Sequence, residues 1–448
     1  MATQLTLSFY EQRAKPKEKK AHSEWGTFKD SLRAPIHRWF TYPAGFSYKA
    51  VEHSIERYGI VSGQTIYDPF MGSGTTNLTA KTLGINSAGI EAHPFVYQIT
   101  KAKLNWDIDA KQIKDFVDLI QKSLLKKSET LQKRKLQTEF PELILKCYEE
   151  KSLYDLWALR ELVTENLKDE DARGFFFVVV TAMLRNISIA ATGWPYIAPN
   201  KAKTTSHNKD VLTEFILLSN QMINDVQEIK IWSNNKYKRS KHNLINGDSR
   251  NTIGLIEDHS VDHVFTSPPY LNNFDYADRT RLELYFWGHA KSWGEISQKI
   301  RTVLMTSATT QINRTDERYE ILDEFSNECP KVAKFVNDSV EKLAGIRKTK
   351  GGKKSYDLMV AGYFNDMYKI IKDVYRVMKP NTNALFVLGD SAPYGIHIPT
   401  DKLIGDIGIS IGFKSYEIEE LRTRGDKWKA NPQRHNIPLR ESIVILSK

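Results

Sequence analysis

Short apolar runs alternate with helical patterns along much of the chain, and most runs end at a glycine, proline or acidic turn. Runs of this length that contain β-branched and aromatic residues predict strands buried on both faces, as in a parallel sheet. The expected strands are 64–68, 87–90, 242–245, 261–265, 384–388, 413–421 and 442–446. Helical periodicity predicts helices over about 48–58, 75–83 and 356–377. The pattern therefore indicates the α/β class.

Two segments interrupt this alternation. Residues 107–240 carry heptad-like apolar spacing mixed with lysine and glutamate, which predicts several helices and no clear strand. The segment is longer than a normal connection between strands, so we interpret it as a helical insertion. Residues 291–354 form a second insertion, and residues 1–30 form a flexible basic arm. The expected helices of the first insertion are 109–135, 152–167, 171–190 and 209–230.

Composition limits the class of protein. The chain has 448 residues, of which 41% are hydrophobic and 26% charged, as in ordinary globular proteins. No apolar run approaches the roughly 20 residues of a membrane span, and the N-terminus lacks the apolar segment of a secretory signal. Cys147 and Cys329 are too few for a structural zinc site and suggest a reducing compartment, so we expect a cytoplasmic protein without metal or membrane contact. The net charge of +10 fits a polyanionic partner.

The chemistry concentrates at Thr266-Ser267-Pro268-Pro269-Tyr270, directly after the strand 261–265. The two prolines lack an N–H group and fix the backbone, so the strand must end in a rigid extended tip. In open α/β sheets, ligands bind at the carboxyl ends of the strands. The Ser267 hydroxyl and nearby carbonyls could accept the N–H groups of an aromatic amine while Tyr270 stacks on its ring. An ordinary strand-to-loop turn is the alternative.

A glycine turn follows the first strand, in Asp-Pro-Phe-Met-Gly-Ser-Gly-Thr-Thr at 68–76. Gly72 and Gly74 let a ligand approach the backbone closely, and the start of a helix favours a negative group. No Gly-Lys-Ser/Thr follows, which excludes the phosphate loop of nucleoside triphosphatases. Glu91 closes the second strand about 20 residues later, where α/β nucleotide binders hold ribose hydroxyls. A surface glutamate is the alternative there.

These two motifs, in this order, resemble the cofactor and catalytic motifs of the S-adenosylmethionine-dependent DNA amino-methyltransferases. The resemblance implies a Rossmann-like methyltransferase sheet, mostly parallel with an antiparallel final strand. It also implies S-adenosyl-L-methionine as cofactor and double-stranded DNA as partner. It covers the sheet-forming parts from about residue 36 onward and neither insertion, which makes 31–106, 241–290 and 355–448 the catalytic domain.

The resemblance also implies roles for individual residues. The catalytic tip would be Ser267, Pro268, Pro269 and Tyr270, with acceptors that draw the amino nitrogen toward tetrahedral geometry. A segment around residues 37–46 would cover the cofactor, with an aromatic core plug as the alternative, and Asp248 would lie near the adenine. The implied cofactor-binding residues are Tyr42, Pro43, Phe46, Asp68, Phe70, Gly72, Gly74, Thr75, Thr76, Glu91, Asp248 and Thr266.

DNA recognition is expected in the insertions, chiefly in 291–354 together with part of 107–240. Residues 347–354 place five basic side chains around two glycines, which predicts a flexible cationic loop suited to phosphates. A plain surface loop is the alternative. The candidate DNA-binding residues are Arg347, Lys348, Lys350, Lys353 and Lys354.

The family resemblance also suggests the target base. Serine before Pro-Pro-Tyr is associated mainly with cytosine-N4 methylation, and aspartate with adenine-N6 methylation. We therefore expect a site-specific cytosine-N4 DNA methyltransferase of prokaryotic or phage type that flips its target base, with a cognate restriction endonuclease as a candidate partner. An adenine-N6 enzyme, an RNA guanine-N2 methyltransferase and a non-catalytic DNA-binding protein on the same scaffold remain alternatives.

Overall fold

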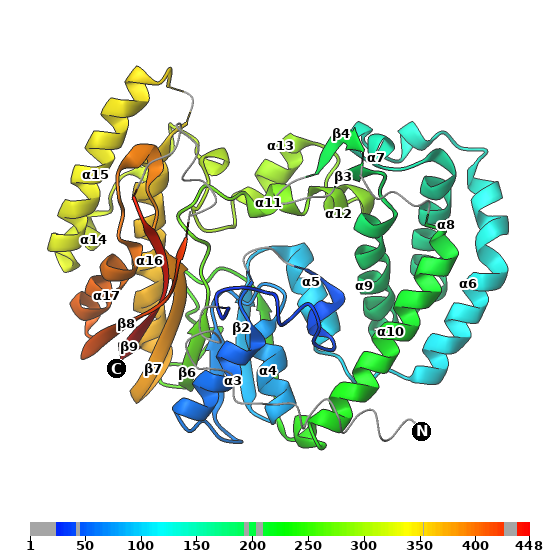
Figure 1. The fold of residues 1–448 in the computed structure, drawn as a ribbon, viewed down its shortest axis with the longest axis horizontal. Coiled ribbons are helices and arrows are strands. Elements are labelled where there is room, and N and C mark those ends of the chain that lie inside the picture. The colour runs from blue at the N-terminus through cyan, green and yellow to red at the C-terminus, as the bar shows by residue number, and fades with distance from the viewer. Residues whose placement is uncertain (1–23, 42–44, 192–196, 203–208, 353, 425–436) are drawn as a thin grey trace.

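A seven-stranded sheet stands between two groups of helices in the computed structural model (Figure 1). The structure describes residues 24–41, 45–191, 197–202, 209–352, 354–424 and 437–448. The strand order is β5-β2-β1-β6-β7-β9-β8. The strands are β1 (Thr65–Asp68), β2 (Asn86–Glu91), β5 (His242–Asn246), β6 (Val261–Thr266), β7 (Met378–Gly389), β8 (Ser415–Arg424) and β9 (Leu439–Ser447).

Strand directions confirm the expected fold class. The neighbouring strands β5, β2, β1, β6 and β7 run parallel to one another. Strand β9 lies antiparallel between β7 and β8. The sheet is therefore Rossmann-like and mostly parallel, with a final strand that enters antiparallel.

Both faces of the sheet are buried because consecutive side chains of a strand point to opposite faces. One face carries Ile66, Phe265 and Leu385, which pack with α3 (Tyr48–Arg57) and α4 (Thr75–Leu83). The other carries Val264 and Phe386, which pack with α16 (Tyr356–Val377) and α17 (Thr400–Ile411). The continuous burial explains why the strands read as short apolar runs. The prediction missed α17 entirely.

Strand β6 also buries two polar residues near its start, Asp262 and His263, and both have partners. Asp262 accepts a hydrogen bond from the Thr65 N–H at 2.9 Å and pairs with Lys379 at 2.7 Å. His263 shares a 2.5 Å hydrogen bond between its Nε2 and the hydroxyl of Ser54 on α3. These contacts fix the start of β6 against β1 and α3, and so set the position of the tip that follows it.

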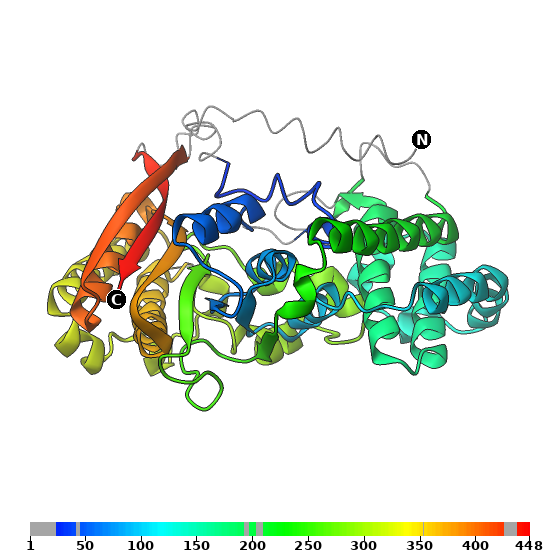
Figure 2. The same cartoon turned by 90° about the horizontal axis from the view of Figure 1, so that it is seen from below.

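The first insertion forms a helical body beside the sheet in both views (Figures 1 and 2). It has its own hydrophobic cluster, which includes Trp106, Trp157, Phe176 and Phe215. The prediction of no strand was wrong, because a short antiparallel pair, β3 (Ala190–Ala191) and β4 (Ala198–Ala202), lies within it. The helices of the insertion are α6 (Ala110–Leu131), α7 (Glu142–Cys147), α8 (Glu150–Asn166), α9 (Glu170–Ile187) and α10 (Val211–Trp232), and α5 (Pro94–Lys103) precedes it.

The first part of the second insertion packs on the cluster of the helical body through Ile296 and Ile300. Its later part, with the long helix α15, lies on the opposite side of the sheet (Figure 1). Part of the predicted flexible loop 347–354 is helical, since α15 does not end until Thr349. Buried residues such as Val336 and Leu343 recur at helical spacing along α15. The helix therefore extends beyond residue 347, where the loop was expected to begin. The helices of this insertion are α13 (Trp293–Ile296), α14 (Asp323–Glu328) and α15 (Pro330–Thr349), and α11 (Tyr276–Arg279) and α12 (Arg281–Phe286) come just before it.

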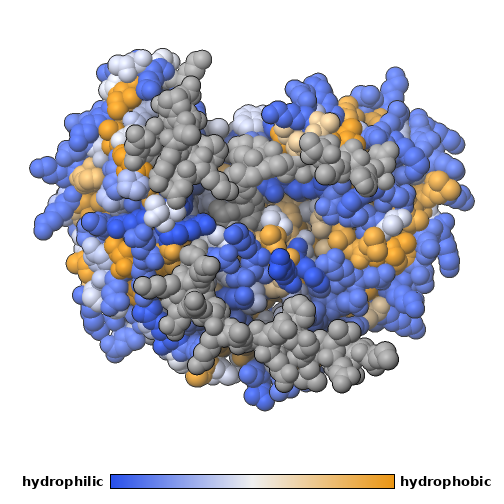
Figure 3. Space-filling model, viewed as in Figure 1, coloured by the Kyte–Doolittle hydropathy of each residue, from blue (hydrophilic) through white to orange (hydrophobic). Residues whose placement is uncertain are grey.

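Hydrophilic residues cover most of the described surface on the face drawn in Figure 3, and apolar residues occur there in small groups. No described helix is both long enough and apolar enough to cross a bilayer. Within the same residues, no group of three or more histidine, cysteine, aspartate or glutamate side chains could hold a metal ion.

Candidate cofactor and catalytic site

A pocket opens at the carboxyl ends of β1, β2, β5 and β6, the edge of the sheet at which ligands of open α/β folds bind. The empty space inside it, including the open mouth, is about 920 Å³. The glycine turn, Glu91, Asp248, Ser267 and Pro269 all line it. The structure therefore brings the two sequence motifs together in one cavity.

The glycine turn between β1 and α4 has the backbone that only glycine adopts easily. Gly72 and Gly74 have φ values of 51° and 85°, in the left-handed region. A Cβ on Gly74 would also come within 2.6 Å of the Thr100 methyl group. Gly74 is the N-cap of α4, and no side chain in the described chain caps this helix. Its first N–H groups can therefore serve a negative ligand group.

Glu91 lies at the end of β2 and accepts a hydrogen bond from the glycine turn. Its Oε2 accepts a hydrogen bond from Gly72 N at 2.8 Å, and its Oε1 accepts one from His93 N at 2.7 Å. Burial raises the pKa of Glu91 to about 7, although the two backbone N–H groups oppose this shift. Each carboxylate oxygen keeps a lone pair for a hydroxyl in the pocket.

Asp68 ends β1 and is completely buried beside the tip. Its Oδ1 accepts hydrogen bonds from Phe70 N at 3.0 Å and from the Thr266 hydroxyl at 2.6 Å. Its Oδ2 is buried without a hydrogen-bond partner among the described residues. Burial raises the pKa of Asp68 to about 6. Neither Asp68 nor Thr266 is part of the pocket lining, and their hydrogen bond ties the cofactor strand to the catalytic strand.

Asp248 lies at the open side of the pocket, about half exposed, just after β5. Its carboxylate pairs with Arg250 at 2.6 Å, and Arg250 also pairs with Asp366 of α16 at 3.2 Å. Asp366 in turn accepts a hydrogen bond from Thr306 N at 2.8 Å. This chain of charges holds the pocket mouth between β5, α16 and the second insertion.

The tip after β6 presents Ser267 and Pro269 to the pocket, while Pro268 is buried. The Ser267 hydroxyl donates its proton to the carbonyl of Val387 on β7, at 3.0 Å. Because a hydroxyl has one proton and two lone pairs, this bond leaves Ser267 Oγ as an acceptor. The geometry thus suits a ligand that brings an N–H group to the tip.

Tyr270 differs from the expectation that its ring faces a ligand. It is 6% exposed and does not line the described pocket. Its hydroxyl donates to Glu441 Oε1 on β9 at 2.8 Å, and burial raises its pKa well above the usual value. The guanidinium of Arg424 lies 5.2 Å from the centroid of its ring.

Comparisons with known proteins agree with this arrangement. A family model described as DNA methylase matches residues 5–102, which contain the glycine turn and Glu91. The type II methyltransferase M.BsoBI of Geobacillus stearothermophilus is 27% identical, over 92% of this chain and 86% of that protein. The type II methyltransferase M.AvaI of Nostoc sp. is 25% identical, over 89% of this chain and 83% of that protein. The type II methyltransferase M.MvaI of Kocuria varians is 24% identical, over 88% of this chain and 85% of that protein.

These similarities support an amino-methyltransferase family of the N4/N6 type for this chain. The methyl donor of this family is S-adenosylmethionine. The pocket of this methyltransferase fits such a molecule. Ile90, Phe70 and Leu304 supply apolar surface for an aromatic ring, Glu91 can accept from ribose hydroxyls, and the uncapped start of α4 suits a carboxylate.

Of the three cofactor-binding residues predicted in the segment before β1, the structure describes Phe46. Phe46 lines the pocket and packs on Phe265 of β6, with ring centroids 5.3 Å apart. Tyr42 and Pro43 lie outside the described residues. Of the glycine-turn predictions, Phe70, Gly72 and Thr75 line the pocket. The Thr76 hydroxyl instead donates to the Phe265 carbonyl at 3.1 Å.

Sequence reasoning missed a buried cation under the glycine turn. Lys103, at the end of α5, is completely buried and donates to the Ser73 carbonyl at 2.7 Å and to the His37 carbonyl at 3.5 Å. Burial lowers the pKa of Lys103 to about 7. It joins the glycine turn to the segment before β1, and no motif marks it in the sequence.

The second insertion also lines the pocket, which the sequence did not indicate. Val303, Leu304, Met305, Ser307 and Gln311 form one wall together with Asp275 and Tyr276 of the loop after the tip. Asp275 is buried and pairs with Arg301 at 2.8 Å, so the loop and the insertion hold each other in place. These residues carry no recognisable motif.

The candidate DNA-binding residues lie at the end of α15. Lys348, Lys350 and Lys354 are exposed, with Lys350 5.6 Å from the ring of Tyr394. Arg347 is different, because its guanidinium pairs with the buried Asp357 at 2.8 Å. That ion pair anchors α15 to α16. Lys353 lies outside the described residues.

Proposed function

We propose that this DNA methyltransferase moves the methyl group of S-adenosylmethionine to the exocyclic N4 amino group of cytosine in duplex DNA, at a specific site. One observation carries the proposal: Ser267 and Pro269 line the same pocket as the glycine turn. A base that reaches the tip would thus meet the bound cofactor. Serine at the first position of the tip favours cytosine, by the resemblance of Ser-Pro-Pro-Tyr to the cytosine-N4 motif.

For this reaction the protein must supply hydrogen-bond acceptors for the amino group and hold the base in a fixed orientation. When bound, S-adenosylmethionine supplies an electrophilic methyl group. The amino nitrogen of cytosine is a poor nucleophile because its lone pair is delocalised into the ring. Ser267 Oγ, which donates to Val387 and so keeps its lone pairs free, can accept one amino N–H bond. The neighbouring carbonyls can accept the other, which favours tetrahedral geometry at nitrogen and stabilises developing positive charge.

The target nitrogen is inside the stack of a duplex, so the base must turn out of the helix to reach the tip. The net charge of +10 supports binding to the phosphate backbone. Lys348 near the end of α15, and Lys350 and Lys354 just after it, are our candidate phosphate contacts. The helical insertion and α15 flank the sheet on opposite sides (Figure 1), so a duplex at the pocket could touch both. We place base-edge recognition in 291–354 with part of 107–240.

Mass analysis of the methylated nucleoside tests the proposal. The purified protein is incubated with labelled S-adenosylmethionine and mixed-sequence duplex DNA, and the DNA is digested to nucleosides. N4-methylcytosine is the expected product. N6-methyladenine would keep the fold and mechanism but show that Ser267 does not fix the base. Label in RNA, or no label in either nucleic acid, would overturn the proposal that duplex DNA is the substrate.

A cognate restriction endonuclease is part of the proposal, since the similar proteins are type II methyltransferases. DNA methylated by this enzyme would then resist cleavage by an endonuclease with the same recognition sequence. Mapping the methylated positions by sequencing would give that recognition sequence. Methylation without sequence preference would contradict this part of the proposal.

A further inference from the structure

The ring of Tyr270 is held by the C-terminal hairpin of β8 and β9 and not by the pocket. Its hydroxyl donates a 2.8 Å hydrogen bond to Glu441 Oε1, and Glu441 is only 2% exposed. The two residues are 171 positions apart in the sequence. A buried carboxylate that accepts from a tyrosine hydroxyl restricts both the tilt and the direction of the ring, since the hydrogen bond is directional.

Glu441 is itself fixed from two sides. Arg422 on β8 donates from Nε to Glu441 Oε2 at 2.5 Å, so both carboxylate oxygens are engaged. Gly26 of the segment before β1 lies against the same carboxylate, and a Cβ at that position would clash with it. Glu441 therefore has little freedom to move away from Tyr270.

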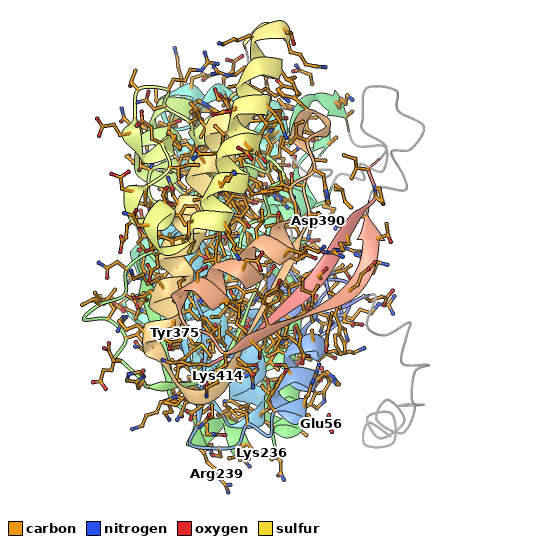
Figure 4. All side chains as sticks on the ribbon, turned by 90° about the vertical axis from the view of Figure 1, so that its left-hand side faces the viewer. Glu56, Lys236, Arg239, Tyr375, Asp390 and Lys414 are labelled. Atoms are coloured by element: carbon orange, nitrogen blue, oxygen red, sulfur yellow. The ribbon has the colours of Figure 1, made fainter. Side chains whose placement is uncertain are left out.

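Arg424 covers the ring of Tyr270. Its Cζ lies 5.2 Å from the ring centroid, and its Nη2 donates to the carbonyl of Asp390 at 2.6 Å. Asp390 follows the end of β7, at the opposite end of the sheet from Tyr375 and Lys414 (Figure 4). A guanidinium is flat and stacks on aromatic faces, as a nucleobase does. Arg424 thus lies over the ring of Tyr270, on which a base could stack.

We propose that Glu441 is a positioning residue for methyl transfer, which sets the Tyr270 ring for the target base, and that Arg424 occupies the base's place on that ring until DNA binds. The inference rests on the proposed function, because it takes Tyr270 as the stacking partner of the flipped base. Glu441 does not touch the reacting atoms. It acts by pre-orienting the surface on which the base is held at the tip.

A double-mutant cycle tests the role of Glu441. Tyr270→Phe removes only the hydroxyl, and Glu441→Gln keeps the shape of the side chain but removes its charge. Each change should lower kcat about tenfold with the Kd for S-adenosylmethionine unchanged, and the double variant should be no worse than either single variant. Glu420→Gln, on an exposed site of the same hairpin, is the matched control and should keep the wild-type kcat.

Two kinetic results would overturn the proposal. Glu441→Gln with normal kcat would show that the contact does not position the ring. Glu441→Gln that lowers kcat as much in the Tyr270→Phe background as in wild type would show that it acts by another route. If Glu441→Gln does not fold, Gly26→Ala gives a second way to displace the carboxylate, and the same loss of kcat is expected.

A spectroscopic readout separates this inference from the proposed function. The 20 tyrosines can be labelled as 3-fluorotyrosine, and the ¹⁹F signal of Tyr270 assigned by its loss in Tyr270→Phe. Glu441→Gln should shift that signal without DNA, whereas Glu420→Gln should not; an unmoved signal overturns the inference whichever nucleic acid is methylated. If the wild-type enzyme methylates DNA, adding duplex DNA and S-adenosylhomocysteine should shift the Tyr270 signal, because the target base replaces Arg424 on the ring. An unshifted signal would overturn this replacement of Arg424 by the base.

Discussion

The pocket has two halves that are built in different ways. The cofactor half is the glycine turn between β1 and α4 with Glu91, which lie within 20 residues of one another and bond mainly through backbone groups. The catalytic half is the tip after β6, whose partners Val387 and Glu441 come from the distant strands β7 and β9. The first half is local in sequence and the second is not, so the two should respond differently to substitution.

The largest expected effect is at the glycine turn. Gly72→Arg places a long side chain on a residue with φ of 51° that lines the pocket, and should weaken S-adenosylmethionine binding by more than about 100-fold. Equilibrium binding of the labelled cofactor measures this loss. Gly63→Arg is a matched control, because Gly63 has φ of 94° and open space around it. Normal cofactor binding by Gly72→Arg would remove the glycine turn from the site.

The next effect belongs to the catalytic half alone. Ser267→Ala removes the acceptor at the tip and should lower kcat by about 100-fold, in the range found for loss of one stabilising polar group. Cofactor affinity should stay within about twofold of wild type, because Ser267 contributes no bond to the glycine turn. Single-turnover methylation and cofactor binding, measured on one preparation, check both statements. Near-normal turnover would assign the acceptor role to the carbonyls.

The hydrogen bond between Thr266 and Asp68 joins the two halves, so breaking it tests how separate they are. Thr266→Val keeps the shape but leaves Asp68 Oδ1 with only its backbone partner, and should reduce the free energy of unfolding by about 1–3 kcal/mol. Denaturant unfolding measures the change. We expect cofactor affinity and kcat to fall together. A loss confined to one of them would show that the halves work independently.

Exposed lysines at and just after the end of α15 should affect DNA binding without changing either half of the pocket. The triple variant Lys348→Gln, Lys350→Gln, Lys354→Gln should raise the KM for DNA roughly tenfold with kcat unchanged. The slope of log affinity against log salt should fall by up to about 0.9 for each phosphate that the variant no longer neutralises. Lys331→Gln, at the far end of the same helix, is the control. An unchanged salt slope would place the DNA-binding surface elsewhere.

The smallest effect concerns pH. Burial raises the pKa of Glu91 to about 7 and of Asp68 to about 6, so both lose charge as the pH falls below neutrality. The affinity for S-adenosylmethionine should fall several-fold between pH 8 and pH 6, because a protonated carboxyl has one acceptor fewer. The free energy of unfolding of the unliganded protein should change in the opposite sense and be larger at low pH. A group whose pKa is raised by folding contributes stability at low pH, and this contribution is lost as the pH rises through about 7. Glu91→Gln should flatten the binding profile, and an unchanged profile would exclude Glu91 as its source.

The contrast between local and distant features also explains which predictions the structure confirms. Residues 64–84 were predicted closely because each feature there is local: an apolar strand, two glycines with positive φ, and a helix ended by Gly84 at φ 74°. The short strand pair β3–β4 and the helical end of the supposed loop 347–354 were missed. Both depend on packing against other elements, and local residue preference is too weak to reveal it.

The sequence by itself determined the strand that ends in Ser-Pro-Pro-Tyr, the glycine turn, the order of these two motifs and the family they resemble. Proline fixes its own φ and glycine permits the positive φ that a tight turn needs, so those features need no partner elsewhere in the chain. Only the tertiary structure decided that Tyr270 bonds Glu441, that Lys103 lies under the glycine turn and that residues 303–311 wall the pocket. Such contacts join residues that are brought together by the sheet order, and the sequence near each residue does not specify its distant neighbour.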